Sequence, residues 1–139
     1  MHFTSKERHG LRAVAELAVR YGEGPVPLSE VAEAQGIALA TLEQVVAPLR
    51  RAGLLVATRG VSGGYTLARS PESISVGEVL RALGDRAAAP CLESHAACER
   101  APSCITRPIW AAVQERLHET LDDTSLADIA RRACDKEIA

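Results

Sequence analysis

Apolar residues recur every three or four positions over three stretches of the first third of the chain, which is the spacing of an amphipathic helix. The stretches cover residues 5–21, 28–35 and 39–52. Thr4 and Glu7 have the spacing of a capping box at the start of the first stretch. The pattern therefore predicts three helices, with a short glycine-containing turn between the second and the third.

Two short helices joined by such a turn are typical of a helix-turn-helix motif, although any helical hairpin has the same spacing. The next residues favour the first interpretation. Residues 54–58 and 65–67 have the pattern of two strands, and the glycine-rich segment 59–64 between them suits a tight turn. A hairpin directly after a helix-turn-helix is a wing. Arg59, at the base of this hairpin, suits insertion into a DNA minor groove.

The second half of the chain predicts a short helix, a cysteine-containing loop and a long amphipathic helix. Ser75 and Glu78 form a second capping-box pair, for a helix over 76–83. Apolar residues then step by four along a helix over about 105–121, and this stripe needs a partner. It consists of Ile105, Ile109, Val113, Leu117 and Leu121, with Trp110 beside it. Because the first three helices form a unit of their own, we expect the partner to be the same helix of a second subunit. A last short helix is expected over 125–133.

Composition and charge narrow the class of protein. The 139 residues are 47% hydrophobic but only 3% aromatic, which favours helices packed through small side chains. The net charge is −2, with +1 in residues 1–67 and −3 in residues 68–139, so DNA binding depends on where the charges lie. No apolar run reaches the roughly 18 residues of a membrane span, and the N-terminus lacks a signal-peptide pattern. We therefore expect a cytoplasmic protein with reduced thiols.

Three of the four cysteines lie close together, at Cys91, Cys98 and Cys104. In the cytoplasm such a cluster indicates metal or redox chemistry more than structural disulfides. Zinc sites and ferredoxin-type clusters favour tighter spacings than these, so the spacing alone indicates only three thiols that are able to converge. Cys134 lies apart from them, and we expect it to be a buried or simply exposed thiol.

Longer motifs run through nearly the whole chain. They are Phe3-Thr-Ser-Lys6, Leu42-Glu43-Gln44, Leu49-Arg50-Arg51-Ala52-Gly53-Leu54, Arg59-Gly60-x-x-Gly63-Gly64-Tyr65-x-Leu67-Ala68-Arg69, Val76-Gly-Glu-Val-Leu80, the three cysteines and Ser125-Leu-Ala-Asp128. Together they resemble the Rrf2 family of bacterial winged-helix regulators, which includes IscR, NsrR and RirA. The resemblance implies a homodimer joined by the long helix over 105–121, binding to double-stranded operator DNA, and an iron–sulfur cluster held by three cysteines of each subunit.

The resemblance also assigns DNA contacts, with the third helix entering the major groove. The assigned positions are Thr41, Glu43, Gln44, Arg50, Arg51, Arg59, Gly60, Ser62, Gly63, Gly64 and Tyr65. The chain departs from the family where Ala38 and Ala40 replace residues that are often serine, which removes a helix cap. Pro48 lies inside the recognition helix, where its ring costs about 3 kcal/mol if it clashes. We therefore expect a kink or early loosening there, and an operator that differs from the common family site.

The resemblance assigns an iron–sulfur cluster, [2Fe–2S] or [4Fe–4S], to the three clustered cysteines but leaves its fourth ligand open. IscR-like members have a histidine three residues beyond the third cysteine, where this chain has Arg107, which cannot bind iron. NsrR-like members use an acidic residue near the start of the partner's first helix, and the matching residue here is Arg8, with Glu7 and His9 adjacent. We expect an open or solvent-bound position first, then Glu7 or His95, and after them His9 or Cys134.

The sequence thus predicts a mainly α fold with a small β wing, in three parts. These are a winged helix-turn-helix over residues 1–84, a cysteine-rich metal- or cluster-binding loop over 85–104, and a dimerisation helix with a C-terminal helix over 105–139. We expect a transcription regulator, acting as a repressor, that senses iron–sulfur status, iron, redox state or nitric oxide. The alternatives are a thiol–disulfide switch without a cluster and a metal- or partner-binding adaptor with no DNA role. No nucleophile–base pair or phosphate-binding loop stands out, so we do not expect an enzyme.

Overall fold

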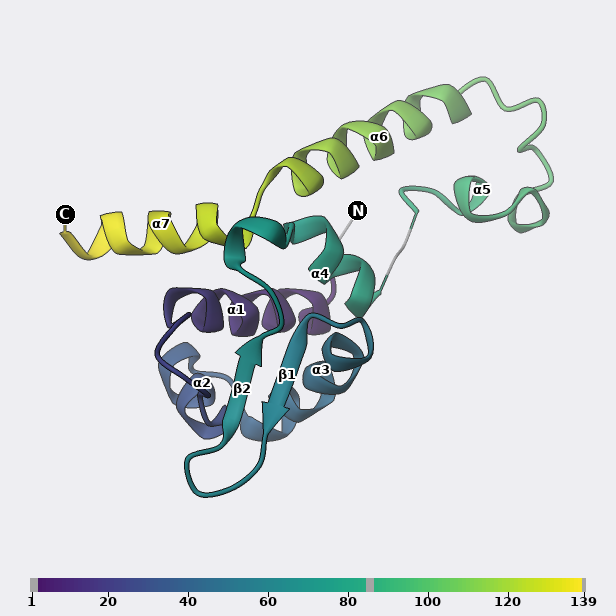
Figure 1. The fold of residues 1–139 in the computed structure, drawn as a ribbon. Helices are drawn as coiled ribbons and strands as arrows, with labels where there is room; N and C mark the ends of the chain where they lie inside the picture. The colour runs from purple at the N-terminus through teal and green to yellow at the C-terminus, as the bar shows by residue number, and fades with distance from the viewer. Residues whose placement is uncertain (1–2, 85–86, 139) are drawn as a thin grey trace.

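The computed structural model of the protein describes residues 3–84 and 87–138 (Figure 1). In chain order the elements are α1 (Ser5–Val19), α2 (Leu28–Gln35), α3 (Leu39–Arg51), β1 (Leu55–Thr58), β2 (Gly64–Leu67), the 3₁₀ helix η1 (Pro71–Ser73), α4 (Val76–Leu83), α5 (Pro90–Glu93), the 3₁₀ helix η2 (His95–Ala97), α6 (Arg107–Asp123) and α7 (Leu126–Ile138). The mainly α fold with a two-stranded wing is confirmed. Within the described part of the chain, no helix combines the length and apolar content needed to cross a membrane.

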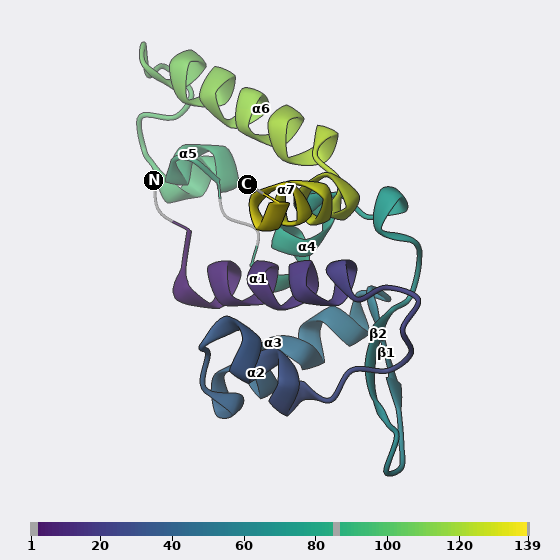
Figure 2. The same ribbon diagram turned by 90° about the vertical axis from the view of Figure 1, so that its left-hand side faces the viewer.

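Helix α1 lies at the centre of the fold. Figure 2 shows it between α2 and α3 on one side and α4 and α7 on the other, and it contacts all four helices. The largest fully buried side chains come from nearly all of these elements: Val14, Val31, Leu42, Val45, Leu49, Ile74, Val79 and Leu126. Gly10 allows the close approach of α4, because a Cβ atom there would overlap the side chain of Leu83. Helix α7 is therefore part of the same core as the helix-turn-helix.

The turn between α2 and α3 is the one that the sequence predicts. Gly36 adopts the left-handed conformation, with φ of 62°, at the C-terminal end of α2. Helix α3 then runs through Pro48 to Arg51, and the amide of Ala52 donates to the carbonyl oxygen of Pro48 at 3.0 Å. Pro48 lacks only the amide that would bond to the carbonyl of Gln44. Early loosening of the helix at Pro48 was therefore the wrong expectation, because the last turn keeps its hydrogen bonds.

The wing is tied to the rest of the molecule by a backbone bridge. Strands β1 and β2 pair antiparallel, with Leu55 opposite Leu67. Outside this pair, Val26 in the α1–α2 loop forms an isolated bridge with Tyr65 of β2. The Val26 amide donates to the Tyr65 carbonyl at 3.0 Å, and the Tyr65 amide donates to the Val26 carbonyl at 2.8 Å. The bridge fastens one edge of the wing to the loop that leads into the helix-turn-helix.

The segment after α4 differs in detail from the prediction. Residues 85–86, at the start of the expected cysteine-rich loop over 85–104, lie outside the described residues, and the rest of that loop contains the short helices α5 and η2. Helix α6 begins at Arg107, so Ile105 precedes it and is 92% exposed. Helix α7 continues to Ile138, five residues further than expected, and its core contacts include Leu126, Ile129 and Ala130, within the expected range.

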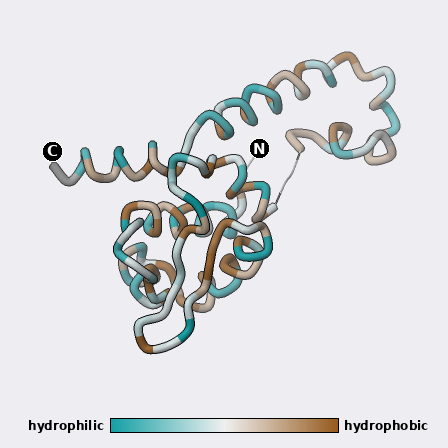
Figure 3. The backbone as a smooth tube through the Cα atoms, in the orientation of Figure 1, coloured by the Kyte–Doolittle hydropathy of each residue, from teal (hydrophilic) through white to brown (hydrophobic). Residues whose placement is uncertain are grey.

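Helix α6 is fastened to the core at one end only. Close to its C-terminal end, the amide of Val76 donates to the carbonyl of Thr124 at 2.8 Å, and Arg81 of α4 forms an ion pair with Asp122 at 2.8 Å. From there α6 extends away from the body and carries the cysteine loop at its far end (Figure 1). Figure 3 shows that the half of α6 near the loop is more hydrophobic than the half near α7.

Candidate nucleic-acid interface and cysteine loop

Helix α3 exposes the side opposite its packed face. Its buried residues are Leu42, Val45, Val46 and Leu49. Of the residues assigned to DNA contacts, Glu43, Gln44, Arg50 and Arg51 are exposed, and Thr41 is half-buried. Ala38 begins the helix without a side-chain cap, as its alanine side chain requires, and its carbonyl accepts from the Thr41 amide at 3.0 Å. Helix α3 thus has an accessible outer surface with side chains that suit contacts with bases and with phosphates.

The wing presents its loop to solvent and uses its glycines to do so. Arg59, Gly60 and Ser62 are exposed in this loop. A Cβ atom on Gly63 would overlap the carbonyl oxygen of Thr58, so the turn requires glycine at that position. The remaining two assigned wing residues, Gly64 and Tyr65, are half-buried at the bridge to Val26. These two therefore hold the wing in place, whereas the loop residues are free to contact a ligand.

A hollow of about 550 Å³ lies between α3 and β1. It is lined by Ala47, Arg50, Arg51, Leu55, Val56 and Ala57. The segment 37–69, which contains α3 and the wing, has four arginines and one acidic residue, although the chain as a whole has a net charge of −2. The local charge of +3 is the sign that a polyanion requires. Arg50, Arg51 and Arg59 are exposed on α3 and the wing, whereas Arg69 forms an ion pair with Glu78 at 2.8 Å.

The cysteine loop holds three free thiols in different surroundings. Cys91, in α5, is 7% exposed, Cys98 and Cys104 are half-buried, and Cys134 is exposed on α7. Among residues 3–84 and 87–138, no three His, Cys, Asp or Glu side chains are close enough together to hold a metal ion. The structure therefore brings the three cysteines into one loop, but a metal centre would require the loop to close further around it.

Cys104 lies in an environment that favours its thiolate form. The Thr106 hydroxyl lies 3.2 Å from its Sγ atom and lowers the pKa of the thiol, and the amides of Thr106 and Arg107 lower it further. Thiolates are the forms that bind metals and attack disulfides. The loop is held to α6 through the amide of Ala88, which donates to Gln114 Oε1 at 2.8 Å. The Cys104 thiol thus lies in a loop that is hydrogen-bonded to α6.

The Arg107 side chain, three residues beyond Cys104, carries a donor atom without a partner. Its Nε atom is buried and has no hydrogen-bond partner among the described residues. A buried donor without an acceptor costs about 1–3 kcal/mol, so such atoms usually have a partner. Three thiols with an unpaired cationic donor three residues beyond the last of them suit a negatively charged iron–sulfur cluster. The donor set therefore fits the group in its chemistry.

Glu7 has a structural role in its own subunit. Its side chain is 4% exposed, and Oε2 accepts a hydrogen bond from the Thr4 amide at 2.6 Å in the capping box of α1. A Cβ atom on Gly84 would lie 3.2 Å from Oε1, so the carboxylate also packs against the end of α4. Sequence reasoning missed the burial of Glu7 because its contact with Gly84 is a tertiary one. The side chain of His95, the other suggested ligand, lies outside the described part of the structure.

Comparison with known sequences finds relatives along nearly the whole chain. The sequence profile of the Rrf2 family, described as an iron-dependent transcriptional regulator, matches residues 3–132. The HTH-type transcriptional regulator IscR of Aliivibrio salmonicida is 37% identical over 129 residues, which is 93% of this chain and 77% of that protein. Protein rrf2 of Nitratidesulfovibrio vulgaris is 37% identical over 134 residues, 96% of this chain and 89% of that one.

Solved structures agree with the sequence relatives. T. potens IscR matches with a TM-score of 0.82 and 35% identity, covering 100% of this chain and 93% of that one. CymR, the global cysteine regulator of B. subtilis, matches with a TM-score of 0.80 and 35% identity, covering 95% and 98%. These relatives are regulators and not enzymes, as the sequence predicts. The winged helix-turn-helix, its accessible cationic surface and these relatives together place the chain in the Rrf2 family of transcriptional regulators.

Proposed function

We propose that the protein is a homodimeric repressor that binds operator DNA through α3 and the wing and senses its signal through an iron–sulfur cluster held by Cys91, Cys98 and Cys104. The observation that carries this proposal is the arrangement of α6. Its free end adjoins the loop with the three cysteines, and its other end is fastened to the DNA-binding unit by the Arg81–Asp122 ion pair and the Val76–Thr124 hydrogen bond.

The charges and exposure of the surface support the DNA-binding part. Glu43 and Gln44 project from the exposed side of α3, where they would contact base edges in a major groove. Arg50 and Arg51 line the hollow beside β1, where a sugar–phosphate strand would pass. Arg59, in the exposed wing loop, would enter the adjacent minor groove.

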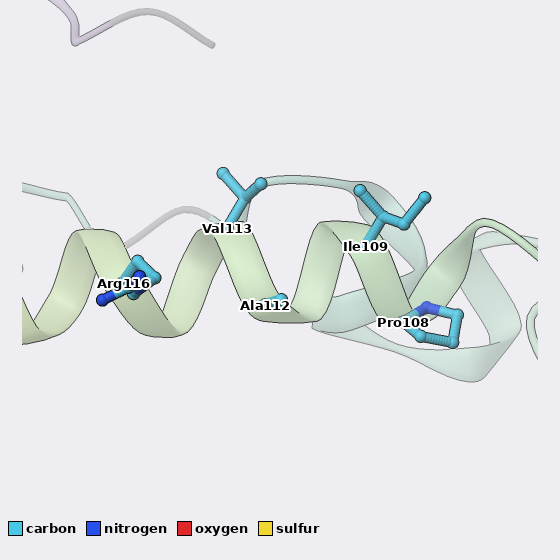
Figure 4. A pocket seen from close by; sticks show the side chains of 5 residues that line it. All are labelled: Pro108, Ile109, Ala112, Val113 and Arg116. Carbon is cyan, nitrogen blue, oxygen red and sulfur yellow. The ribbon is translucent and has the colours of Figure 1, made fainter.

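The apolar surface of α6 supports the dimer. None of the residues of α6, all of which the structure describes, is buried within the subunit. Ile109, Trp110 and Val113 are 59%, 44% and 41% exposed. Figure 4 shows Ile109 and Val113 on the same side of the helix, next to a hollow of about 510 Å³ that they line with Pro108, Ala112 and Arg116. Contiguous exposed apolar residues on a helix that extends from the body suit burial against a second copy of the chain.

The signal would pass along α6. When bound, the cluster supplies iron sites that respond to oxygen, nitric oxide or iron shortage. Cys91, Cys98 and Cys104 would hold the cluster, and Arg107 Nε would donate toward it. The loop that would hold it is joined by α6 to the DNA-binding unit, where the Val76 amide donates to the Thr124 carbonyl. A two-state shift of this kind alters how the dimer presents its two α3 helices to DNA.

The proposal is tested by an ultraviolet–visible spectrum of protein purified without oxygen, with iron and sulfide counted per subunit. We expect a brown protein with equal iron and sulfide. The Cys98→Ala variant should be colourless yet still dimeric, whereas the matched Cys134→Ala variant should keep its colour. A colourless wild-type protein, after reconstitution with iron and sulfide had also failed, would contradict the cluster and leave the DNA-binding part standing.

A second candidate is a regulator whose thiols form a disulfide switch without a cluster. The lowered pKa of the Cys104 thiol favours it, because thiolates carry out disulfide exchange. CymR of Staphylococcus aureus, with 31% identity and a TM-score of 0.73, is a structural relative solved in an oxidized form. Mass spectrometry of the peroxide-treated, iron-free protein distinguishes the two. A reversible disulfide that changes operator affinity in protein that never holds iron would favour the switch.

A further inference from the structure

The outward face of α3 carries a regular stripe with two alanines in it. Ala40, Gln44, Ala47 and Arg51 follow one another at intervals of four, three and four residues, and all four are exposed. At 3.6 residues per turn these positions lie along one line on the helix. The line is opposite to the buried residues Leu42, Val45, Val46 and Leu49. The stripe is therefore the part of α3 that would lie deepest in a DNA groove.

We propose that Ala40 and Ala47 contact thymine methyl groups in the major groove, on either side of an adenine that Gln44 recognises. The inference rests on the proposed DNA binding and adds which bases are recognised. Thymine is the one base that presents a methyl group in the major groove, and an alanine methyl is an apolar partner for it. Glutamine matches the N6 and N7 atoms of adenine with two hydrogen bonds. The stripe thus selects adenine–thymine pairs.

The small side chains also decide how closely the helix approaches. Alanine extends one carbon atom from the backbone, so at positions 40 and 47 nothing longer holds α3 away from the base edges. The first turn contains no acidic residue and no side-chain cap that would repel or occupy an approaching phosphate. Arg51, at the end of the stripe, and Arg50 supply the charge that a DNA strand requires, on the rim of the hollow that Ala47 also lines.

In the first step, the unmodified full-length protein selects a binding sequence from a pool of random DNA duplexes. Each thymine of the selected site is then replaced in turn by deoxyuridine, which pairs identically but lacks the methyl group. We expect replacement at two thymines of each half-site to weaken binding about fourfold each, the transfer value of one buried methyl group. Replacement of the other thymines should leave the affinity unchanged.

Alanine-to-serine variants assign the two methyl groups to their partners. In Ala40→Ser the penalty at one of the two thymines should disappear while the other remains, and Ala47→Ser should show the reverse. The matched control is Ala34→Ser, at an exposed position of α2 away from the stripe, which should keep both penalties. If a site is selected but every deoxyuridine is tolerated, the inference is overturned and DNA binding stands. If selection enriches no sequence, the proposed function itself fails.

Discussion

Replacement of Gly64 by alanine should detach the wing from the α1–α2 loop. Gly64 has a φ of +153°, and a Cβ atom there would overlap the carbonyl carbon and oxygen of Val26 and lie 2.6 Å from the nitrogen of Pro27. These are backbone atoms, which cannot rotate aside as a side chain can. The loop and the strand must therefore separate, and both hydrogen bonds between Val26 and Tyr65 are lost.

The size of the effect follows from two contributions. Each backbone hydrogen bond contributes about 1 kcal/mol net to stability, so the two together contribute about 2 kcal/mol. A residue with a Cβ atom at positive φ costs about 1–2 kcal/mol more than glycine. We therefore expect Gly64→Ala to lower the free energy of unfolding by about 3–4 kcal/mol. The matched control is Gly60→Ala, where φ is +109° and nothing lies within 4 Å of the added atom, so only the second contribution applies.

The measurement is urea denaturation of both variants and the wild type at one protein concentration, because the stability of the proposed dimer would depend on concentration. Gly64→Ala should be less stable than Gly60→Ala by about 2 kcal/mol, the value of the two lost bonds. The same variant should bind DNA more weakly, since the wing is no longer held beside α3. Equal losses of stability in the two variants would refute the close contact between Gly64 and Val26 as the reason for glycine at this position.

Three further predictions test other parts of the molecule. Leu126→Ala, at a side chain with 0% exposure, should lower stability by about 2–5 kcal/mol in thermal denaturation, and a loss near zero would contradict the packing of α7 into the core. Glu78→Gln should destabilise the protein at pH 7, because the bond from Arg69 and the Ser75 amide lower the pKa of this carboxyl below its ordinary 4.5. A depressed pKa contributes stability above the ordinary value, so the difference from wild type should shrink in melts as pH falls below about 4.5, and a constant difference would argue against it. Ile109→Glu should convert the proposed dimer to monomer in sedimentation velocity with unchanged circular dichroism, since it places a charge in the apolar surface of α6; a persistent dimer would exclude that surface as the interface.

Elements with strong local signals were predictable to the residue. Helix α2 ends where Gly36 adopts positive φ, and α4 begins where Ser75 and Glu78 bond to each other's backbone amides at 3.1 and 3.0 Å. These contacts join residues within one turn of each other, so they can be predicted from a few consecutive residues. The same holds for the cysteine loop, which is recognisable because its three thiols are near neighbours in the chain.

Contacts and burial that depend on residues distant in the chain could not be predicted from the sequence. The bridge between Val26 and Tyr65 joins positions 39 residues apart, and the burial of Glu7 depends on Gly84 at the far end of α4. Helix α7 packs Leu126, Ile129 and Ala130 against a core built by residues much earlier in the chain. In the same way, the spacing of the cysteines did not determine that Cys91 is buried while Cys98 and Cys104 are partly accessible.

The winged helix-turn-helix could be predicted from consecutive residues, because caps, turns and periodic apolar faces are local interactions. The resemblance of the longer motifs to the Rrf2 family supplied the candidate ligands. The attachment of the wing to the α1–α2 loop, the Arg81–Asp122 pair at one end of α6, and the outward position of Ala40 and Ala47 on α3 became known from the folded structure. Each of these depends on which surfaces pack together, and packing is a property of the whole folded chain.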